Sequence, residues 1–340
     1  MDIRLNDYVT QAALRLFVVA TLLCAPALTH AAEAYPPLKI DLVPQRVKGT
    51  DTYYVLGRTA VPDNRNAGFT ANAGFVVTSQ GVVVFDALGT PALGKALIAA
   101  IRKRTSLPIR YVVVSHYHAD HMYGLQAFRD ETSALIIAQH QARNYKDSLD
   151  AGKRLRQREQ SLAPWVNDAT RVIQPDLTFE NDIVFTLGGK TFRVVYAGPA
   201  HAPDDSMMLV NPGGVLFAGD IVQNHRIPFM NSDEVNTTNW LAGLDKVLEM
   251  KPSHIIPGHG EPSDDPKAAI EFTENYIRFV RAQMKAAVQN WQPFEEAYQS
   301  VDWSRYAAMP AFKQTNRGNA YRVYLDMESS LLDTNDGADN

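Results

Sequence analysis

An apolar, β-branched run ends at a cluster of histidines in the stretch "VVVSHYHADHMYG", residues 112–124. The run predicts a buried strand, and the cluster then lies where that strand enters a loop. A catalytic acid–base pair and a polar turn rich in histidine are alternatives to a metal site. Four side chains this close in sequence fan out in different directions, so they cannot all bind one ion without strain. Two adjacent ions resolve this, with His116 and His118 on one and Asp120 and His121 on the other.

Each ion needs further ligands, and three later segments supply candidates of the right kind. His201 follows a strand-like run in "VVYAGPAHAPDD", Asp220 ends "GVLFAGD", and His259 stands in "HIIPGHGEP". Site residues collect at the ends of strands in layered α/β proteins. Isolated histidines such as His140 and His254 are expected to have surface or packing roles.

The order of predicted elements indicates an α/β protein with helices covering sheets. Short strand-like runs fill residues 52–85, a helical pattern with proline at its start covers 91–105, and strand-like runs return at 185–220. The charged segment 140–160 is expected to be helical and could cover the site. From residue 266 the pattern is mainly helical, and this tail either packs on the core or forms a dimer face.

The first 32 residues have the pattern of a secretory signal peptide: a polar stretch, an apolar run and small residues suited to cleavage. We therefore expect three parts, namely a signal peptide (1–32), a catalytic domain (33–265) and a helical C-terminal extension (266–340). The protein is expected to be exported, periplasmic or secreted. An uncleaved membrane anchor is the alternative, but residues 16–28 are short for a span of about 20 residues.

Composition limits the chemistry and the partners. The single cysteine, Cys24, lies in the signal segment, so the mature chain has no thiolate for catalysis or metal binding. The net charge of −4 favours neither nucleic acid nor another polyanion as partner. We expect a small-molecule substrate, no nucleic acid, no stable membrane insertion after cleavage, and a monomer or homodimer.

The motifs "HYHADH", "AGPAH", "FAGD" and "PGHG", in this order, resemble those of the metallo-β-lactamase fold superfamily. The upstream run "GVVVFDALG" resembles it too, with Asp86 at the position of an aspartate of that family. The resemblance covers residues 68–260. It implies a four-layer αβ/βα sandwich, here with a helical C-terminal extension, and a site at one edge between two β-sheets.

The resemblance also implies how the ligands are shared between two metal ions. One set would be His116, His118 and His201, and the other would be Asp120, His121 and His259. Asp220 would bridge the two ions, and Asp86 would hold a ligand imidazole by a hydrogen bond. Five imidazoles and two carboxylates suit zinc best, while iron and manganese are compatible with the same set.

Two such ions share a water and lower its pKa, so the expected reaction is attack of a bridging hydroxide on a carbonyl. Asp120 would orient this hydroxide. Aspartate at position 220 resembles glyoxalase II-like thioesterases and lactonases, whereas the β-lactamases of the superfamily have cysteine or no ligand there. Together with export, this resembles the sulfur-oxidation-associated and quinoprotein-associated hydrolases. An ester, thioester, lactone or amide-type carbonyl is therefore the expected target.

The sequence leaves two other activities open. One is periplasmic hydrolysis of β-lactams, and the other is oxidation of persulfides by an iron-dependent dioxygenase that uses a single metal. His118 argues against the flavin-linked di-iron relatives, which have a carboxylate there, and the seven filled ligand positions argue against a non-catalytic module. Substrate contacts are expected from residues next to the ligands: Tyr117, Tyr123, Asn224 and Arg226.

Overall fold

A seven-stranded sheet forms one half of the sandwich, and its strands lie side by side in chain order. The first four strands pair antiparallel, and the last four pair parallel. Their sequences are rich in valine, isoleucine and aromatic residues, which suit a buried pleated surface. The strands are β1 (Gln45–Arg46), β2 (Thr52–Val55), β3 (Ala73–Val77), β4 (Val82–Phe85), β5 (Ile109–Val113), β6 (Leu135–Gln139) and β7 (Leu177–Phe179).

A second sheet of five strands, ordered β13-β11-β10-β9-β8, forms the other half. Its pairs are antiparallel except β11 and β13, which run parallel because α6 (Thr237–Glu249) lies between them in the chain. A short parallel pair, β12 (Gln223–Asn224) and β14 (His259–Gly260), stands apart from both sheets. The five strands are β8 (Asp182–Leu187), β9 (Lys190–Tyr196), β10 (Ser206–Asn211), β11 (Val215–Phe217) and β13 (His254–Ile256).

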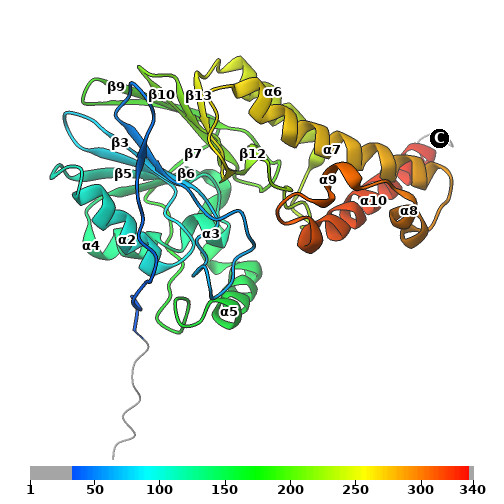
Figure 1. Cartoon of the computed structure of the whole chain (residues 1–340), viewed down its shortest axis with the longest axis horizontal. Coiled ribbons are helices and arrows are strands. Elements are labelled where there is room, and N and C mark those ends of the chain that lie inside the picture. Colours follow the sequence, from blue (N-terminus) through cyan, green and yellow to red (C-terminus); the bar gives the residue numbers. More distant parts are fainter. Residues whose placement is uncertain (1–32, 337–340) are drawn as a thin grey trace, which may run out of the picture. The chain divides into compact units, whose positions relative to one another are not determined.

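The structure is a computed structural model that describes residues 33–336, with side chains through residue 331. The predicted signal peptide therefore lies outside the described residues. The inner faces of the two sheets meet in an apolar layer, where the rings of Phe85 and Phe217 stack with centroids 5.2 Å apart. Helices cover both outer faces (Figure 1), so the predicted αβ/βα sandwich with C-terminal helices is confirmed.

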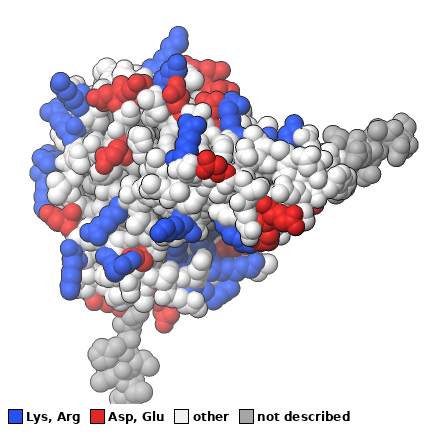
Figure 2. All heavy atoms as spheres, turned by 45° about the vertical axis from the view of Figure 1, so that its right-hand side comes forward, with Lys and Arg blue, Asp and Glu red and all other residues white. Residues whose placement is uncertain are grey.

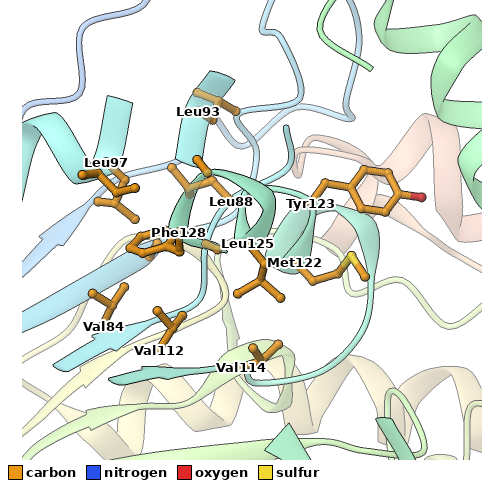
Figure 3. Close-up of a cluster of buried hydrophobic side chains, with 14 of the residues drawn as sticks. Val84, Leu88, Leu93, Leu97, Val112, Val114, Met122, Tyr123, Leu125 and Phe128 are labelled. Carbon is orange, nitrogen blue, oxygen red and sulfur yellow. The ribbon is translucent and has the colours of Figure 1, made fainter. Parts of the chain in front are cut away.

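The helices on the seven-stranded sheet are α2 (Pro91–Arg102), the short α3 (Ala119–Met122) and α4 (Leu125–Glu131). α2 begins where the sequence predicts, because the Thr90 side chain accepts a hydrogen bond from the Leu93 N–H and proline follows the cap. Leu93 and Leu97 then face Phe128 of α4 and Val84 of the sheet (Figure 3). This packing fixes α3, which carries part of the histidine cluster.

The charged segment after β6 is helical, as predicted. It begins with a 3-10 helix, η1 (His140–Asp147), and continues as α5 (Leu149–Leu162), which Ser148 caps by accepting from the Ala151 N–H. Figure 2 shows basic and acidic side chains interspersed over one face of the molecule. Within residues 33–336, no helix combines the length and the apolar character needed to cross a bilayer.

The C-terminal helices support the loop that follows Asp220. The Thr273 hydroxyl on α7 accepts from the Gln223 N–H and donates to the Gln223 carbonyl, both at 2.9 Å. On α10, the Asn319 side chain accepts from the Met230 N–H and donates to the Pro228 carbonyl. These contacts show the helices packing on the core. They are α7 (Pro266–Gln289), α8 (Phe294–Ser300), α9 (Ser304–Ala307) and α10 (Phe312–Asp336).

We predict that Gly94→Ala destabilises the fold, because α2 approaches the start of α4 at this glycine. A Cβ at position 94 would lie 2.2 Å from the Gly124 carbonyl oxygen. The backbone of one of the two helices would have to move to relieve this clash. The expected loss in the free energy of unfolding, measured by urea denaturation, is about 1–3 kcal/mol.

Gly152→Ala on α5 is the matched control. Its Cβ would meet only the end of the Arg156 side chain, at 3.4 Å. Because alanine has a higher helix propensity than glycine, this substitution should raise the free energy of unfolding by up to about 1 kcal/mol. Equal stabilities for the Gly94 variant and the unmodified protein would contradict the close approach of the two helices.

Candidate metal centre

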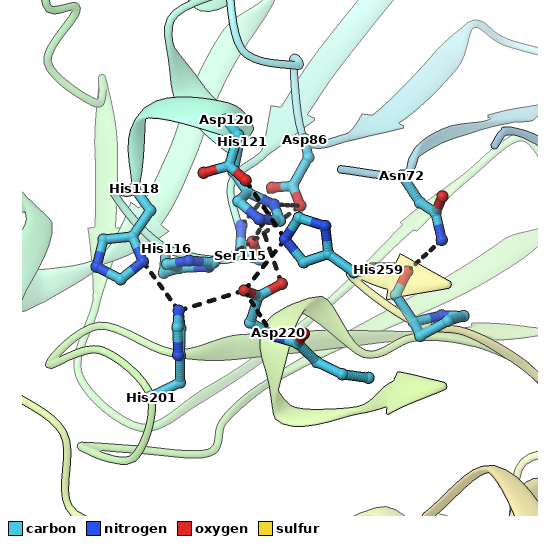
Figure 4. A network of polar contacts seen from close by, with 12 residues as sticks. Asn72, Asp86, Ser115, His116, His118, Asp120, His121, His201, Asp220 and His259 are labelled. Atoms are coloured by element: carbon cyan, nitrogen blue, oxygen red, sulfur yellow. Dashed lines mark hydrogen bonds and ion pairs between the residues drawn. The ribbon is translucent and has the colours of Figure 1, made fainter. Parts of the chain in front are cut away.

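Five histidines and two aspartates converge at one edge of the sandwich, between the two sheets (Figure 4). They come from four parts of the chain: the segment from the end of β5 into α3, the β9–β10 loop, the turn η2 (Gly219–Ile221) after β11, and β14. Each is the end of a strand or the segment just after it. The structure thus brings together all seven residues that the sequence analysis proposed: His116, His118, Asp120, His121, His201, Asp220 and His259.

Three of the imidazoles form a first group that could hold an ion. The nitrogens of His116, His118 and His201 lie within 4.8 Å of one another. His118 Nδ1 and His201 Nε2 face each other at 2.9 Å. The His116 Nε2 atom is buried and has no hydrogen-bond partner among the described residues. Three imidazole nitrogens aimed at one point match the donor set of a divalent transition metal.

A second group lies beside the first and consists of Asp120, His121 and His259. The Asp120 Oδ2 atom is 3.3 Å from His259 Nε2 and also accepts from the Thr70 hydroxyl at 3.3 Å. His121 lies on α3 and His118 is the residue that precedes this helix, yet they belong to different groups. The single motif therefore serves both groups, as the sequence analysis predicted.

The Asp220 carboxylate lies between the two groups. Its Oδ2 atom is 3.2 Å from His201 Nε2 of the first group and 3.4 Å from His259 Nε2 of the second. Its Oδ1 atom is 3.3 Å from His121 Nε2. Gly258 permits this position, since a Cβ there would stand 2.0 Å from Asp220 Oδ1. The glycine before His259 in "PGHG" therefore makes room for the carboxylate.

The outer ring nitrogens are held by partners behind the centre. His201 Nδ1 donates to the Phe229 carbonyl at 3.1 Å, and His259 Nδ1 donates to the Thr70 carbonyl at 2.8 Å. A carbonyl oxygen only accepts, so in the neutral rings Nδ1 carries the proton and Nε2 presents its lone pair to the centre. The tautomers needed for metal binding are thus set by the surrounding backbone.

Asp86 organises the same centre from the end of β4. Its Oδ2 atom is 2.8 Å from His121 Nδ1 and accepts from the Ser115 hydroxyl at 2.8 Å, while Oδ1 accepts from the Ser115 N–H at 2.7 Å. The contact with an imidazole expected for Asp86 is present. Asp86 has a φ of 61°, a conformation uncommon for residues other than glycine. These hydrogen bonds hold it there, and strain maintained in this way is typical of functional sites.

Burial and charge act in opposite directions on the imidazoles. Burial lowers the pKa of His116 and His118 well below the ordinary value, and that of His201 to about 4. Burial also pushes the pKa of His121 down, but the Asp220 and Asp86 carboxylates outweigh it and raise the pKa. The first group thus presents neutral rings, and the second attracts a positive charge.

The donor set fits divalent ions. His116 Nε2 and His118 Nε2 are buried without a hydrogen-bond partner in the described part of the chain, and His121 Nε2 and Asp220 Oδ1 contact each other at 3.3 Å. Buried polar atoms in folded proteins nearly always have partners, so their lone pairs need a ligand. A metal ion in each group would accept these lone pairs and balance the buried carboxylates.

The residues predicted to contact substrate have different surroundings. Tyr117 is buried and its hydroxyl donates to the Ile173 carbonyl at 3.0 Å; Asn224 is buried and donates to the Glu261 carbonyl at 2.8 Å. Both side chains therefore donate to backbone carbonyls and are not directed at a substrate in the centre. Tyr123 is fully buried and belongs to the apolar cluster of the first half of the sandwich.

Arg226, the fourth predicted contact, acts on the centre through an intermediate residue. Its Nη1 donates to Gln223 Oε1 at 3.0 Å, and Gln223 Nε2 donates to Asp220 Oδ2 at 3.0 Å. The guanidinium is buried, and burial lowers its pKa while the Asp220 and Asp120 carboxylates act in the other direction.

The sequence analysis missed several residues behind the ligands. Ser115 stands inside the histidine motif, and its hydroxyl is also 3.0 Å from His116 Nδ1. The ring of Trp240 on α6 contacts His201 with centroids 5.1 Å apart. Adjacency to the motif could have identified Ser115. Thr70, Gln223 and Trp240 carry no such signal, since only the fold brings them to the site.

Comparison with known proteins places this geometry in a family. The model of the Metallo-beta-lactamase superfamily matches residues 67–259. A linear primary-alkylsulfatase from Pseudomonas sp. (strain ATCC 19151) is 22% identical over 240 residues, which cover 60% of this chain but only 44% of the alkylsulfatase. A type 2 metallo-beta-lactamase from Elizabethkingia meningoseptica is 24% identical over 257 residues, covering 74% of this chain and 90% of that enzyme.

Solved structures show the same fold. The DIM-1 metallo-beta-lactamase exposed to ceftazidime aligns with a TM-score of 0.55 at 18% identity, over 71% of this chain and 98% of that one. A metallo-beta-lactamase from Pontibacter korlensis aligns with a TM-score of 0.53 at 17% identity, over 70% of this chain and 99% of that one. Since the matching family model spans more than half of the chain and contains all seven residues of the centre, this protein belongs to the metallo-beta-lactamase superfamily.

Proposed function

We propose that this protein is a two-metal hydrolase that cleaves an ester, thioester, lactone or amide-type carbonyl of a small molecule. The observation that carries the proposal is the position of Asp220, whose carboxylate faces imidazoles of both ligand groups. A one-metal enzyme needs neither a second complete group nor a carboxylate between the two. The family supports hydrolysis as the reaction type.

In this proposal one ion would be held by His116, His118 and His201, and the other by Asp120, His121 and His259. Asp220 would serve both groups, since its carboxylate lies between them. Imidazole and carboxylate donors suit zinc best, and iron or manganese accepts the same set. When bound, a pair of divalent ions supplies a water of lowered pKa and polarises the carbonyl under attack. Asp86 keeps the His121 ring oriented for this purpose.

Asp120 is the residue best placed to act on the attacking water. Its side chain is 17% exposed, whereas that of Asp220 is 5% exposed, so Asp120 borders the space that substrate must enter. Burial raises the pKa of Asp120, but the hydrogen bond with His259 and the charge of His121 outweigh it and hold the pKa well below its usual range. The carboxylate therefore stays ionised, and it can orient the water by accepting its proton in a hydrogen bond.

Hydrolysis of β-lactams is the second candidate, because the Elizabethkingia relative is a metallo-beta-lactamase of which this chain covers 90%. Aspartate at position 220 favours the thioesterase-like and lactonase-like members instead. A persulfide dioxygenase is less well supported, since the group around Asp120 is as complete as the group around His116. The N-terminal pattern supports an exported enzyme acting outside the cytosol.

We predict that the mature protein, purified without chelator, contains close to two metal ions per chain. Both ligand groups are complete, and the first presents buried imidazole nitrogens that have no hydrogen-bond partner among the described residues. Elemental analysis by inductively coupled plasma mass spectrometry measures the ratio. One ion or none per chain would contradict the two-metal proposal.

We predict that Asp120→Ala lowers kcat by about 10²–10⁴-fold, the usual contribution of a positioned proton acceptor. Asp245→Ala, at an exposed position on α6, is the control and should leave kcat unchanged. Circular dichroism should show that both variants are folded. Turnover by the Asp120 variant near the rate of the unmodified protein would refute its role.

A panel of chromogenic esters, thioesters, lactones and a cephalosporin separates the candidate reactions. We expect turnover of at least one ester, thioester or lactone, abolished by EDTA and restored by zinc, because the water is activated only with metal present. Turnover of the cephalosporin alone would instead favour the β-lactamase assignment.

A further inference from the structure

The Gln223 side chain joins the Asp220 carboxylate to a buried arginine. Its Nε2 atom donates to Asp220 Oδ2 at 3.0 Å, and its Oε1 atom accepts from Arg226 Nη1 at 3.0 Å. All three residues are buried. They therefore form one hydrogen-bonded chain that ends on the carboxylate between the two ligand groups.

The arginine determines which end of the Gln223 amide faces the centre. A guanidinium has N–H donors and no acceptor, so the amide oxygen must face Arg226. The amide N–H group is then directed at Asp220, whose ionised carboxylate only accepts. Without Arg226, the amide could flip and bring its oxygen against the carboxylate, which repels it.

The amide bonds to the oxygen atom of Asp220 that faces both ligand groups. Oδ2 is 3.2 Å from His201 Nε2 and 3.4 Å from His259 Nε2, whereas Oδ1 is 3.3 Å from His121 Nε2. A hydrogen bond to Oδ2 alone makes the two oxygens unequal, so it favours one rotation of the carboxylate. In that rotation, Oδ2 lies between imidazoles of the two groups.

The backbone that carries the Gln223 amide is fixed on two sides. Thr273 on α7 accepts from the Gln223 N–H and donates to the Gln223 carbonyl, both at 2.9 Å. In the short parallel pair, Gln223 of β12 stands opposite His259 of β14. The amide thus reaches Asp220 from a position that is held rigidly relative to a ligand of the second group.

Stability alone does not account for Arg226. Its side chain is buried, its Nε atom has no hydrogen-bond partner, and it makes no ion pair with a carboxylate in the described part of the chain. Burying a charge without a paired charge is costly. Burial lowers the pKa of the guanidinium, and the Asp220 and Asp120 carboxylates oppose this effect. The negative charge that compensates the guanidinium therefore belongs to the centre.

We propose that Gln223 and Arg226 are positioning residues for the metal centre. Arg226 orients the Gln223 amide, and the amide holds Asp220 in the rotation that serves both ligand groups. Neither residue binds an ion or touches the substrate in this role. The inference rests on the proposed two-metal function and deepens it, since it names the residues that keep the shared carboxylate in place.

Zinc affinity, measured by competition with a chromogenic chelator, tests this role. We expect Gln223→Met and Arg226→Met each to weaken the binding of at least one zinc ion about 10–100-fold, the usual effect of removing a partner of a metal ligand. The double variant should bind zinc no more weakly than Gln223→Met alone, because Arg226 acts only through the amide. Arg226→Lys keeps a donor for the amide oxygen and should lose less affinity than Arg226→Met.

Two variants control for the loss of a buried polar group elsewhere. Gln126→Met removes a buried amide that bonds to the Ala169 carbonyl and the Arg171 N–H, and Arg281→Met removes a partly buried guanidinium that donates to the Thr237 hydroxyl. Both should leave zinc affinity unchanged. Urea denaturation in EDTA measures the fold separately. A merely structural role for Gln223 would lower the free energy of unfolding without changing the zinc affinity of the folded protein.

The outcomes separate this inference from the proposed function. Two zinc ions bound equally tightly by the unmodified protein and by the Gln223 variant would leave the two-metal centre standing and overturn the positioning role. A double variant that binds zinc at least about tenfold more weakly than Gln223→Met would overturn the role of Arg226 in orienting the amide. A single zinc ion in the unmodified protein, bound more weakly by both single variants, would refute the two-metal function and support the positioning of Asp220.

Discussion

The Asp220 carboxylate makes the contacts on which the centre depends, because it faces imidazoles from three separate parts of the chain. A buried carboxylate is costly unless positive charge or hydrogen bonds surround it. Burial raises the pKa of Asp220, but His259, His121 and His201 outweigh burial and hold it well below its usual range. Joining these rings around one carboxylate requires the ends of both sheets to meet at this point.

The sandwich provides that meeting through its packing and its loops. Parallel pairing of β11 with β13 brings the turn that carries Asp220 beside the glycine-containing turn that leads to His259. The Thr273 hydroxyl of α7 and the Asn319 amide of α10 fix the segment that follows Asp220. The C-terminal helices, which contribute none of the seven ligands, therefore support the site through the backbone that they hold.

The sequence was sufficient to predict the layers, most strands and helices, and all seven residues of the centre. Their signals are local: β-branched runs, a helical pattern that starts with proline at residue 91, and histidines at strand ends. The prediction of substrate-contacting residues from the sequence was less reliable. Tyr117 and Asn224 are adjacent to ligands in sequence, but neighbouring side chains on a strand or turn point in different directions. Both turn to backbone carbonyls instead. Gln223 and Thr70 depend on contacts between distant segments, which no local pattern reports.

The most direct test of the two-metal centre is a crystal structure of the zinc-loaded protein with an anomalous difference map at the zinc edge. We predict two peaks separated by about 3.5–4 Å, with the Asp220 side chain contacting both. A single peak among His116, His118 and His201, with the group around Asp120 hydrogen-bonded only to protein and water, would contradict the account.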